Sequence, residues 1–480
     1  MNANRAGFTQ AMMVDKTAGK WLPPFLGRQL APVIDRLATL LAGRSEEALA
    51  ERMALAAFAI RVAGAAIAFL SQIVLARVMG EFEYGVFVFV WAMAIILGNL
   101  SCFGFPIAVI RFLPGYRAEE AYAAIRGLAE TARHFTLVSA TTIAALGAAL
   151  LYLAGGQVPG HYLVPLCLGL VIMPMIALGD VLDGTARANS WPIFGLGATF
   201  LLRPTLILAF MLLLVSLGFA KTSVNALWAA LAATYATTIL QYLAVDRRMT
   251  KRFASTERVV ALRIWLAFAL PMFLIEGCYF LLTNSDVLVV GFYMPPDQVG
   301  IYFAAAKTMA LVHFVYFAVK AAAAPRFAAL VAAADKPALA QFARQTVAWT
   351  FWPSLLLGSL VLAAAPFLLA LFGPAFQSGQ PVMTVLFIGI MAKALVGPGE
   401  VLLTMAGEQT RCALIYLTVL IVNIALNITL IPRYGLVGAA AATATAMAVE
   451  ALLLNRVVRF RLGISMFIIG RGPAHGGGAV

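Results

Sequence analysis

Long apolar runs separated by short polar or charged stretches dominate the pattern of this sequence. A hydrocarbon layer about 30 Å thick is crossed by roughly 20 helical residues. Twelve runs of about that length lie between charged residues or Pro and Gly, and each predicts a spanning helix. The predicted spans are 53–76, 84–110, 132–154, 162–182, 193–217, 224–245, 264–292, 299–323, 346–371, 381–405, 411–431 and 436–456. The pattern therefore predicts an all-α integral membrane protein.

Composition supports lipid as the surrounding medium. The 480 residues are 62% hydrophobic and only 11% charged, whereas soluble domains carry about 25% charged residues. The net charge of +13 is therefore interpreted as a topology signal and as attraction to anionic membrane lipids, not as a nucleic-acid site. The four cysteines show neither CxxC nor Cys/His metal spacing, so we expect packing roles and no metal site.

The distribution of Lys and Arg predicts the orientation of the spans. If the N-terminus is cytoplasmic, the segments on the cytoplasmic side hold 27 of the 34 basic residues, and the segments on the outer side hold three. The remaining four lie inside predicted spans. Because cytoplasmic loops are enriched in Lys and Arg, both termini are expected in the cytoplasm, with an even number of spans between them.

Two sequence matches at nearly constant spacing indicate an internal duplication. VMGEFEYGVF after the first span matches VGFYMPPDQVGIY after the seventh, and Gly300 lies 215 residues beyond Gly85. GDVLDGTARAN from Gly179 matches GEVLLTMAGEQTR from Gly399, 220 residues further on. Six spans per half give both halves the same orientation, with substrate expected between them near the midplane. The alternative is that Gly-acid-apolar turns recur in membrane proteins without duplication.

The expected organisation has five parts. They are an N-terminal extension (1–52), a six-helix half (53–245), a basic cytoplasmic linker (246–263), a second six-helix half (264–456) and a cytoplasmic tail (457–480). The extension does not resemble a signal peptide, because it is long and repeatedly charged. Its stretch FLGRQLAPVIDRLATLLAG has apolar residues at helical spacing, which predicts an amphipathic helix on the inner membrane surface. A poorly ordered extension is the alternative.

Four stretches with Gly or Pro follow one another along the spans. They are LARVMGEFEYGVF at 75–87, DVLVVGFYMPPDQVGIYFAAAKTM at 286–309, LFGPAF at 371–376 and LIPRYGLVGAAAATA at 430–444. In this order the chain resembles the polysaccharide (O-antigen and exopolysaccharide) flippase family of the multidrug/oligosaccharidyl-lipid/polysaccharide exporter superfamily. The long N-terminal extension, and an end near twelve spans where some relatives have fourteen, depart from the family pattern.

The resemblance implies a V-shaped, extruder-like bundle of two six-helix halves in a bacterial inner membrane. It implies a flippase that moves undecaprenyl-diphosphate-linked oligosaccharide from the cytoplasmic to the outer leaflet by alternating access, for lipopolysaccharide or exopolysaccharide synthesis. The partners implied are this glycolipid, membrane lipids, and a polysaccharide polymerase and glycosyltransferases. A monomer is expected.

Charges inside the spans are the candidates for substrate binding. A charge at the bilayer centre costs at least about 2.5 kcal/mol, so it normally faces a cavity or a partner. We expect the cations Arg61, Arg203, Lys307 and Lys393 to line a substrate cavity and to replace the water lost by a diphosphate. The alternative is ion pairing with Glu276, Asp180 or Glu400. Arg111, Lys320 and Arg456 are expected to reach the inner headgroups.

A polar stripe follows the seventh span. Glu276, Tyr279, Thr283 and Asp286 are spaced i, i+3, i+7 and i+10, which places them on one helix face and predicts a cavity wall. Glu276 is a candidate site for a coupling H⁺ or Na⁺, and a fixed salt bridge is the equal alternative. No other cofactor is expected.

Catalytic motifs do not appear in the sequence. It has no GxxxxGK[ST] phosphate loop, no HExxH and no nucleophile elbow. A transporter is therefore expected and not an enzyme. Two alternatives remain. An ion-coupled extruder of drugs or organic cations would be expected to have a carboxylate-rich cavity. A membrane glycan polymerase or ligase would be expected to have a large outer loop.

Overall fold

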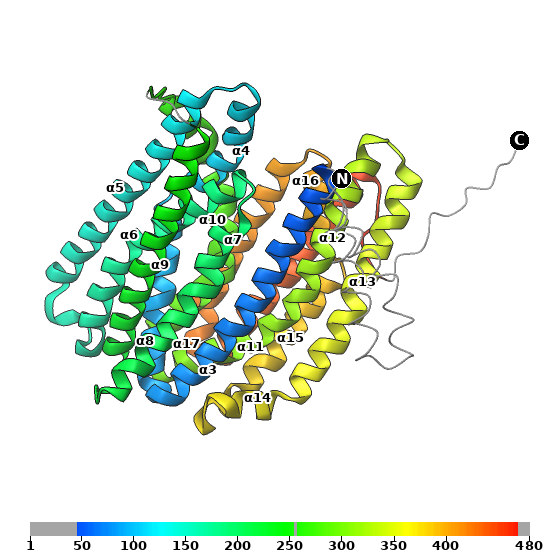
Figure 1. Cartoon of the computed structure of the whole chain (residues 1–480). Helices are drawn as coiled ribbons and strands as arrows, with labels where there is room; N and C mark the ends of the chain where they lie inside the picture. Colours follow the sequence, from blue (N-terminus) through cyan, green and yellow to red (C-terminus); the bar gives the residue numbers. More distant parts are fainter. Residues whose placement is uncertain (1–45, 254–256, 469–480) are drawn as a thin grey trace, which may run out of the picture.

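The structure is a computed structural model that describes residues 46–253 and 257–468 (Figure 1). Within these residues the regular structure is helical, and ten helices are long and apolar enough to cross a membrane. Two of the ten, α3 (Glu46–Leu100) and α17 (Gln409–Leu462), are interrupted by non-helical backbone at Gly80 and Gly435. The described residues therefore form twelve spanning segments, and the predicted fold class is confirmed.

Each half contributes six of these segments. The first half consists of α3, α4 (Phe105–Ala118), α5 (Tyr122–Ala154), α6 (Gly160–Ala188), α7 (Pro192–Gly197), α8 (Arg203–Ser216) and α9 (Ser223–Arg252). The second half consists of α10 (Leu262–Tyr293), α11 (Pro296–Met309), α12 (His313–Ala332), α13 (Lys336–Ala363), α14 (Ala365–Phe372), α15 (Gln380–Ala394), α16 (Gly399–Met405) and α17. The predicted amphipathic helix in the N-terminal extension lies outside the described residues.

Several predicted spans are irregular inside the membrane. The span predicted at 84–110 breaks after Leu100, because Gly104 adopts a left-handed conformation that ends one helix before α4 begins. The span predicted at 381–405 breaks between α15 and α16, where Gly397 also has positive φ. Between α7 and α8 the chain forms a π-helix at Ala198–Leu202, a distortion that is frequent at functional sites.

The hydrophobic cores show where the two halves separate. We call the end of the bundle with the basic segment 246–263 the basic end, at the top of Figure 1, and the opposite end the turn end. At the basic end each half has its own core, one around Leu128 and Leu182 and the other around Phe327 and Leu402. At the turn end a single core contains residues of both halves. The halves therefore meet at the turn end and diverge at the basic end, as in the expected V shape.

Two glycines bring the halves together at the turn end. A Cβ atom at Gly85 would lie 3.2 Å from the backbone nitrogen of Gly300, and a Cβ atom at Gly300 would lie 3.3 Å from the backbone nitrogen of Gly85. Beside them Tyr84, which is fully buried in the first half, packs edge-on against Phe303 of the second half. We call this the glycine contact; it closes the turn end because no side chain separates α3 from α11.

Arg77 adds a polar tie at the same end. Its Nε donates a hydrogen bond to the carbonyl oxygen of Leu371 at 2.7 Å, and its Nη2 donates to that of Ala370 at 2.6 Å. These carbonyls lie in the last turn of α14, where helix carbonyls lack intrahelical partners and a cation is favoured. A side chain of the first half thus caps a helix of the second half.

The segment between the halves is held against the first half. The backbone nitrogen of Val259 donates to the carbonyl oxygen of Ala123 in α5 at 3.2 Å. Arg258 forms an ion pair with Glu130 of α5 at 2.6 Å. The described part of the linker therefore packs against the first half just before the start of α10.

Candidate functional site

A cavity of about 1630 Å³ lies between the two halves. One face of α3 forms a long wall, because its lining residues recur at three- or four-residue spacing. The residues at this spacing are Met53, Ala57, Arg61, Ala65, Ala68, Gln72 and Leu75, and Phe58, Gly64 and Ser71 lie beside them. At 1.5 Å per residue this wall is about 33 Å long. The cavity therefore runs from the basic end, where the halves diverge, to the closed turn end.

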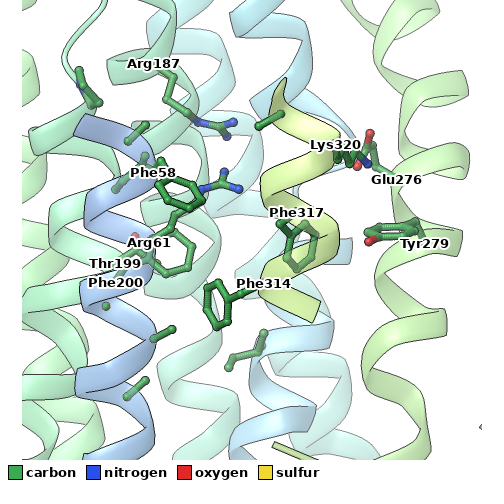
Figure 2. Close-up of a pocket in the computed structure, with 18 of the residues that line it drawn as sticks. Phe58, Arg61, Arg187, Thr199, Phe200, Glu276, Tyr279, Phe314, Phe317 and Lys320 are labelled. Carbon is green, nitrogen blue, oxygen red and sulfur yellow. The ribbon is translucent and has the colours of Figure 1, made fainter. Parts of the chain in front are cut away.

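The first half supplies a wall of arginines. Arg61 of α3, Arg111 of α4, Arg187 of α6 and Arg203 of α8 all line the cavity, and Figure 2 shows Arg61 and Arg187 projecting into it. Carboxylates do not line this wall in the described part of the chain. In the same part, Arg187 pairs with Asp183 at 2.9 Å, whereas Arg61, Arg111 and Arg203 form no ion pair within 4.0 Å. Asp183 and Asp180 lie behind this wall and interact electrostatically, at longer range, with Arg61 and Arg203 respectively.

Local packing fixes the positions of two of these arginines. The Arg203 side chain is only 6% exposed and passes so close to α6 that a Cβ atom at Gly179 would lie 3.1 Å from its Nη2. A glycine at position 179 therefore makes room for the guanidinium. The Arg61 guanidinium lies 5.9 Å from the ring centre of Phe200, a residue of the π-helix, in a cation–π contact.

The second half presents a wall of mixed charge. Lys320 of α12 lies 3.3 Å from Glu400 of α16, and the Tyr316 hydroxyl donates to the same carboxylate at 2.5 Å. Glu276 and Tyr279 of α10 line the wall beside them (Figure 2). Among the described residues Glu276 has no ion-pair partner. The two halves thus differ in charge although their folds repeat.

Two of the four candidate cations lie on the cavity, and two do not. Arg61 and Arg203 line it. Lys393 lies behind the wall and forms an ion pair with Glu450 of α17 at 2.7 Å, where the side chains are 13% and 2% exposed. Lys307 of α11 is also outside the lining, with its Nζ 5.1 Å from the ring centre of Phe303. The role of each cation toward a substrate stays a prediction.

The predicted polar stripe on α10 divides in the same way. Glu276 and Tyr279 line the cavity. Thr283 instead donates its hydroxyl to the carbonyl oxygens of its own helix at Tyr279 and Phe280. Asp286 accepts a hydrogen bond from the Tyr302 hydroxyl at 2.8 Å, which ties α10 to α11. Thr283 and Asp286 are therefore outside the cavity lining, and of the two only Asp286 makes a hydrogen bond between helices.

Four charged residues of the cavity were not among the sequence candidates: Arg111, Arg187, Lys320 and Glu400. The sequence places Arg111 and Lys320 near the ends of spans, where long side chains normally reach the headgroups. The structure places them at the mouth of the cavity instead, because the helices diverge at the basic end. In the sequence, this region is indicated by the GDVLDGTARAN and GEVLLTMAGEQTR matches, which contain Arg187 and Glu400, and by Glu400 as a possible ion-pair partner.

Twelve spanning segments around a cavity between two six-helix halves define a transporter fold. Residues 52–331 match the family described as polysaccharide biosynthesis protein, and residues 271–429 match the MatE family. The chain therefore belongs to the polysaccharide biosynthesis protein family, within the exporter superfamily that the sequence motifs indicate. No curated protein matches the chain in sequence.

Solved structures of the same superfamily share the fold. An inward-facing multidrug resistance MATE family transporter is 14% identical, with a TM-score of 0.67 over 85% of this chain and 98% of that chain. The lipid II flippase MurJ in an inward closed conformation is 14% identical, with a TM-score of 0.66 over 84% of this chain and 87% of that chain. An outward-facing multidrug resistance MATE family transporter is 14% identical, with a TM-score of 0.52 over 85% of this chain and 95% of that chain.

Proposed function

We propose that this protein is a flippase that moves lipid-linked oligosaccharide, in the form of undecaprenyl-diphosphate-linked repeat units, to the outer leaflet of a bacterial inner membrane. The observation that carries the proposal is the arginine wall of the first half. Arg61, Arg111 and Arg203 offer guanidinium groups without an ion-pair partner among the described residues. Guanidinium groups bind phosphate oxygens in a bidentate manner, and their charge replaces the lost hydration of a diphosphate.

The size of the cavity supports a large substrate. Pockets for drug-sized ligands enclose roughly 300–1,000 Å³, and this cavity encloses about 1630 Å³. The glycan and the diphosphate would occupy the cavity, while the prenyl chain would remain in lipid. The match to the family of polysaccharide biosynthesis proteins agrees with this substrate class.

The direction of transport follows from the two ends. The halves diverge toward the basic end, and the distribution of Lys and Arg supports the assignment of this end to the cytoplasm. The higher similarity to inward-facing than to outward-facing transporters supports the same assignment. Substrate would enter from the cytoplasmic leaflet, and the halves would then rock about the cavity to open the glycine contact. Glu276 is the candidate for a coupling H⁺ or Na⁺.

One observation favours a second candidate, an ion-coupled extruder of organic cations. Glu276 lines the cavity without an ion-pair partner in the described residues, and a free carboxylate suits a cationic ligand. The MatE match covers this residue. Because arginines outnumber carboxylates on the cavity wall, we place this function second. Both candidates are transporters and not enzymes.

Purified protein in liposomes tests the proposal. Undecaprenyl diphosphate linked to a fluorescent oligosaccharide is placed in both leaflets, and a membrane-impermeant lectin reports the glycans that become accessible from outside. We expect faster exposure with the protein than with empty liposomes, and slower exposure with Arg61→Ala and Arg203→Ala. Transport of ethidium without any movement of the glycolipid would contradict the flippase and support the extruder.

A further inference from the structure

The closed end of the cavity has a different chemistry from its mouth. Here the lining consists of Ser71, Gln72 and Leu75 of the first spanning segment and Phe87 and Trp91 of the second. These residues carry no formal charge. They lie next to the glycine contact, so this surface is the floor of the cavity. We use the name cavity floor for these five residues.

We propose that the cavity floor binds a sugar ring of the substrate, through the Trp91 ring and the side-chain amide of Gln72. The inference rests on the proposed function, because it assigns a place to the glycan of the same glycolipid. It adds a division of the cavity into an arginine wall for the diphosphate and an uncharged floor for a pyranose.

The aromatic part of the floor has one accessible ring. Phe87 and Trp91 are stacked, with ring centres 6.2 Å apart and an angle of 8° between the planes. Phe87 is only 1% exposed, so the ring surface that borders the cavity belongs mainly to Trp91. The face of an aromatic ring carries partial negative charge, and the C–H face of a pyranose carries partial positive charge. Such a ring therefore suits a sugar better than it suits a phosphate.

The polar part of the floor is oriented before any ligand arrives. The Tyr84 hydroxyl donates to Gln72 Oε1 at 2.9 Å, and this bond fixes the amide. The Gln72 amide nitrogen has no hydrogen-bond acceptor among the described residues, and it can donate to a sugar hydroxyl. The Ser71 hydroxyl is buried in the same floor without a described partner. A prenyl chain placed here would leave these polar groups without partners, which is unfavourable.

The spacing between wall and floor suits one extended ligand. Gln72 follows Arg61 by eleven positions in α3, which is about 17 Å along the helix. A diphosphate at Arg61 would therefore leave room for a short oligosaccharide that reaches the floor. The floor itself lacks a cation, so it would not compete for the diphosphate.

Binding measurements on the full protein in nanodiscs test this assignment. The probes are undecaprenyl diphosphate and the same lipid carrying a trisaccharide of glucose. We expect wild type to bind the glycolipid about tenfold more tightly than the bare lipid. Trp91→Ala and Gln72→Ala should remove this preference and leave the affinity for the bare lipid unchanged. Trp91→Phe should keep most of it, because an aromatic face remains.

Trp228→Ala is the matched control, because Trp228 is 52% exposed and lies outside the cavity lining. It should keep the preference of wild type. The assignment is overturned if wild type shows no preference, if Trp91→Ala keeps it, or if Trp91→Ala weakens both lipids equally. If wild type binds neither lipid, the proposed function fails and this assignment fails with it. Binding of the bare lipid therefore tests the function, and the difference between the lipids tests the floor.

Discussion

Gly85 and Gly300 pack backbone against backbone across the boundary between the two halves. A Cβ atom at Gly85 would collide with the carbonyl oxygen of Pro296, and a Cβ atom at Gly300 would lie 2.9 Å from that of Glu81. The same two glycines are the counterparts in the predicted internal duplication, 215 residues apart. This contact holds the turn end closed in the conformation described here.

We predict that Gly85→Ala opens the turn end. The added Cβ atom would collide with the carbonyl oxygen of Pro296, and overpacking of this kind costs typically about 1–3 kcal/mol. The population should shift toward conformations in which α3 and α11 are separated, as measured by spin-label distances between the two helices. Gly160→Ala is the control, because a Cβ atom at Gly160 meets nothing within 4 Å. An unchanged distance distribution in Gly85→Ala would contradict a closing role for the glycine contact.

Removal of the Arg77 tie should have a similar but smaller effect. Arg77→Ala leaves the carbonyls of Ala370 and Leu371 at the end of α14 without their donor. Hydrogen bonds of charged groups contribute about 1.5–3 kcal/mol, and partial solvent exposure reduces this value here. We expect faster labelling of a cysteine placed at Gln72 by a reagent added at the turn end. Arg433→Ala, an arginine in α17 beside the break at Gly435 near the same end, should label at the rate of wild type.

The arginine wall predicts a loss of glycolipid affinity in Arg61→Ala. Loss of a charge-assisted contact corresponds to a decrease of about tenfold to hundredfold in affinity. Arg61→Lys should recover part of this loss, because it keeps the charge but not the bidentate geometry. The measurement is binding of undecaprenyl diphosphate in nanodiscs. Arg456→Ala is the control at the same end of the bundle and should bind like wild type. Equal affinity of Arg61→Ala and wild type would contradict a role of Arg61 in binding the diphosphate.

Lys393→Ala should lower the stability of the protein, and any loss of transport should follow from that loss of stability. It would leave Glu450, which is 2% exposed, as an unpaired buried carboxylate, and such losses cost about 3–5 kcal/mol. We expect a lower Tm in detergent and less protein in the membrane. The double variant Lys393→Met with Glu450→Met should regain part of the Tm. A Lys393→Ala protein of normal Tm with impaired transport would instead support a direct role in the cavity.

An ion-pair cluster at the basic end predicts a pH dependence. Glu408 accepts a hydrogen bond from Arg461 at 2.6 Å and pairs with Arg411 at 2.7 Å, which joins the two ends of α17. The Arg461 hydrogen bond lowers the pKa of Glu408 from its ordinary value of 4.5. Because the folded pKa is lower than the unfolded one, the stabilisation is present above pH 4.5 and is lost as pH falls through the folded pKa.

Thermal unfolding of wild type and Glu408→Gln measures this dependence. Wild type should have the higher Tm at neutral pH, and the difference should disappear as the medium becomes more acidic than the folded pKa. High salt should also reduce the difference, since the cluster is exposed. A Tm difference that does not change with pH would show that the carboxylate charge is not involved.

The sequence predicts the fold well because lipid imposes a length on every span. The twelve segments and the matched glycines follow from that length and from the spacing of the duplication. Helix breaks inside spans, as at Gly104 and Gly397, are not predicted, because neighbouring helices can satisfy the freed backbone groups. Glycine alone does not reveal whether such neighbours are present.

The site is predicted only in part, because depth along a helix says nothing about which way a side chain faces. Arg203 and Lys393 are equally deep in the sequence, but Arg203 reaches the cavity and Lys393 pairs with Glu450, a partner 57 residues away. Arg111 lies near a span end in the sequence, but the divergence of the halves turns that end into the cavity mouth. Such differences depend on the rotation and tilt of helices, which the pattern of a single span does not contain.

The glycine contact also has the geometry of a symmetric dimer interface. In a two-fold dimer, a residue near the axis meets its own copy in the other subunit. Here Gly85 meets Gly300, its counterpart in the duplication, in the same reciprocal way. The chain can therefore be regarded as two six-helix subunits covalently joined through the segment before α10. The arginine wall, however, lies in one half alone, so the two halves match in packing at this contact and differ in charge at the cavity.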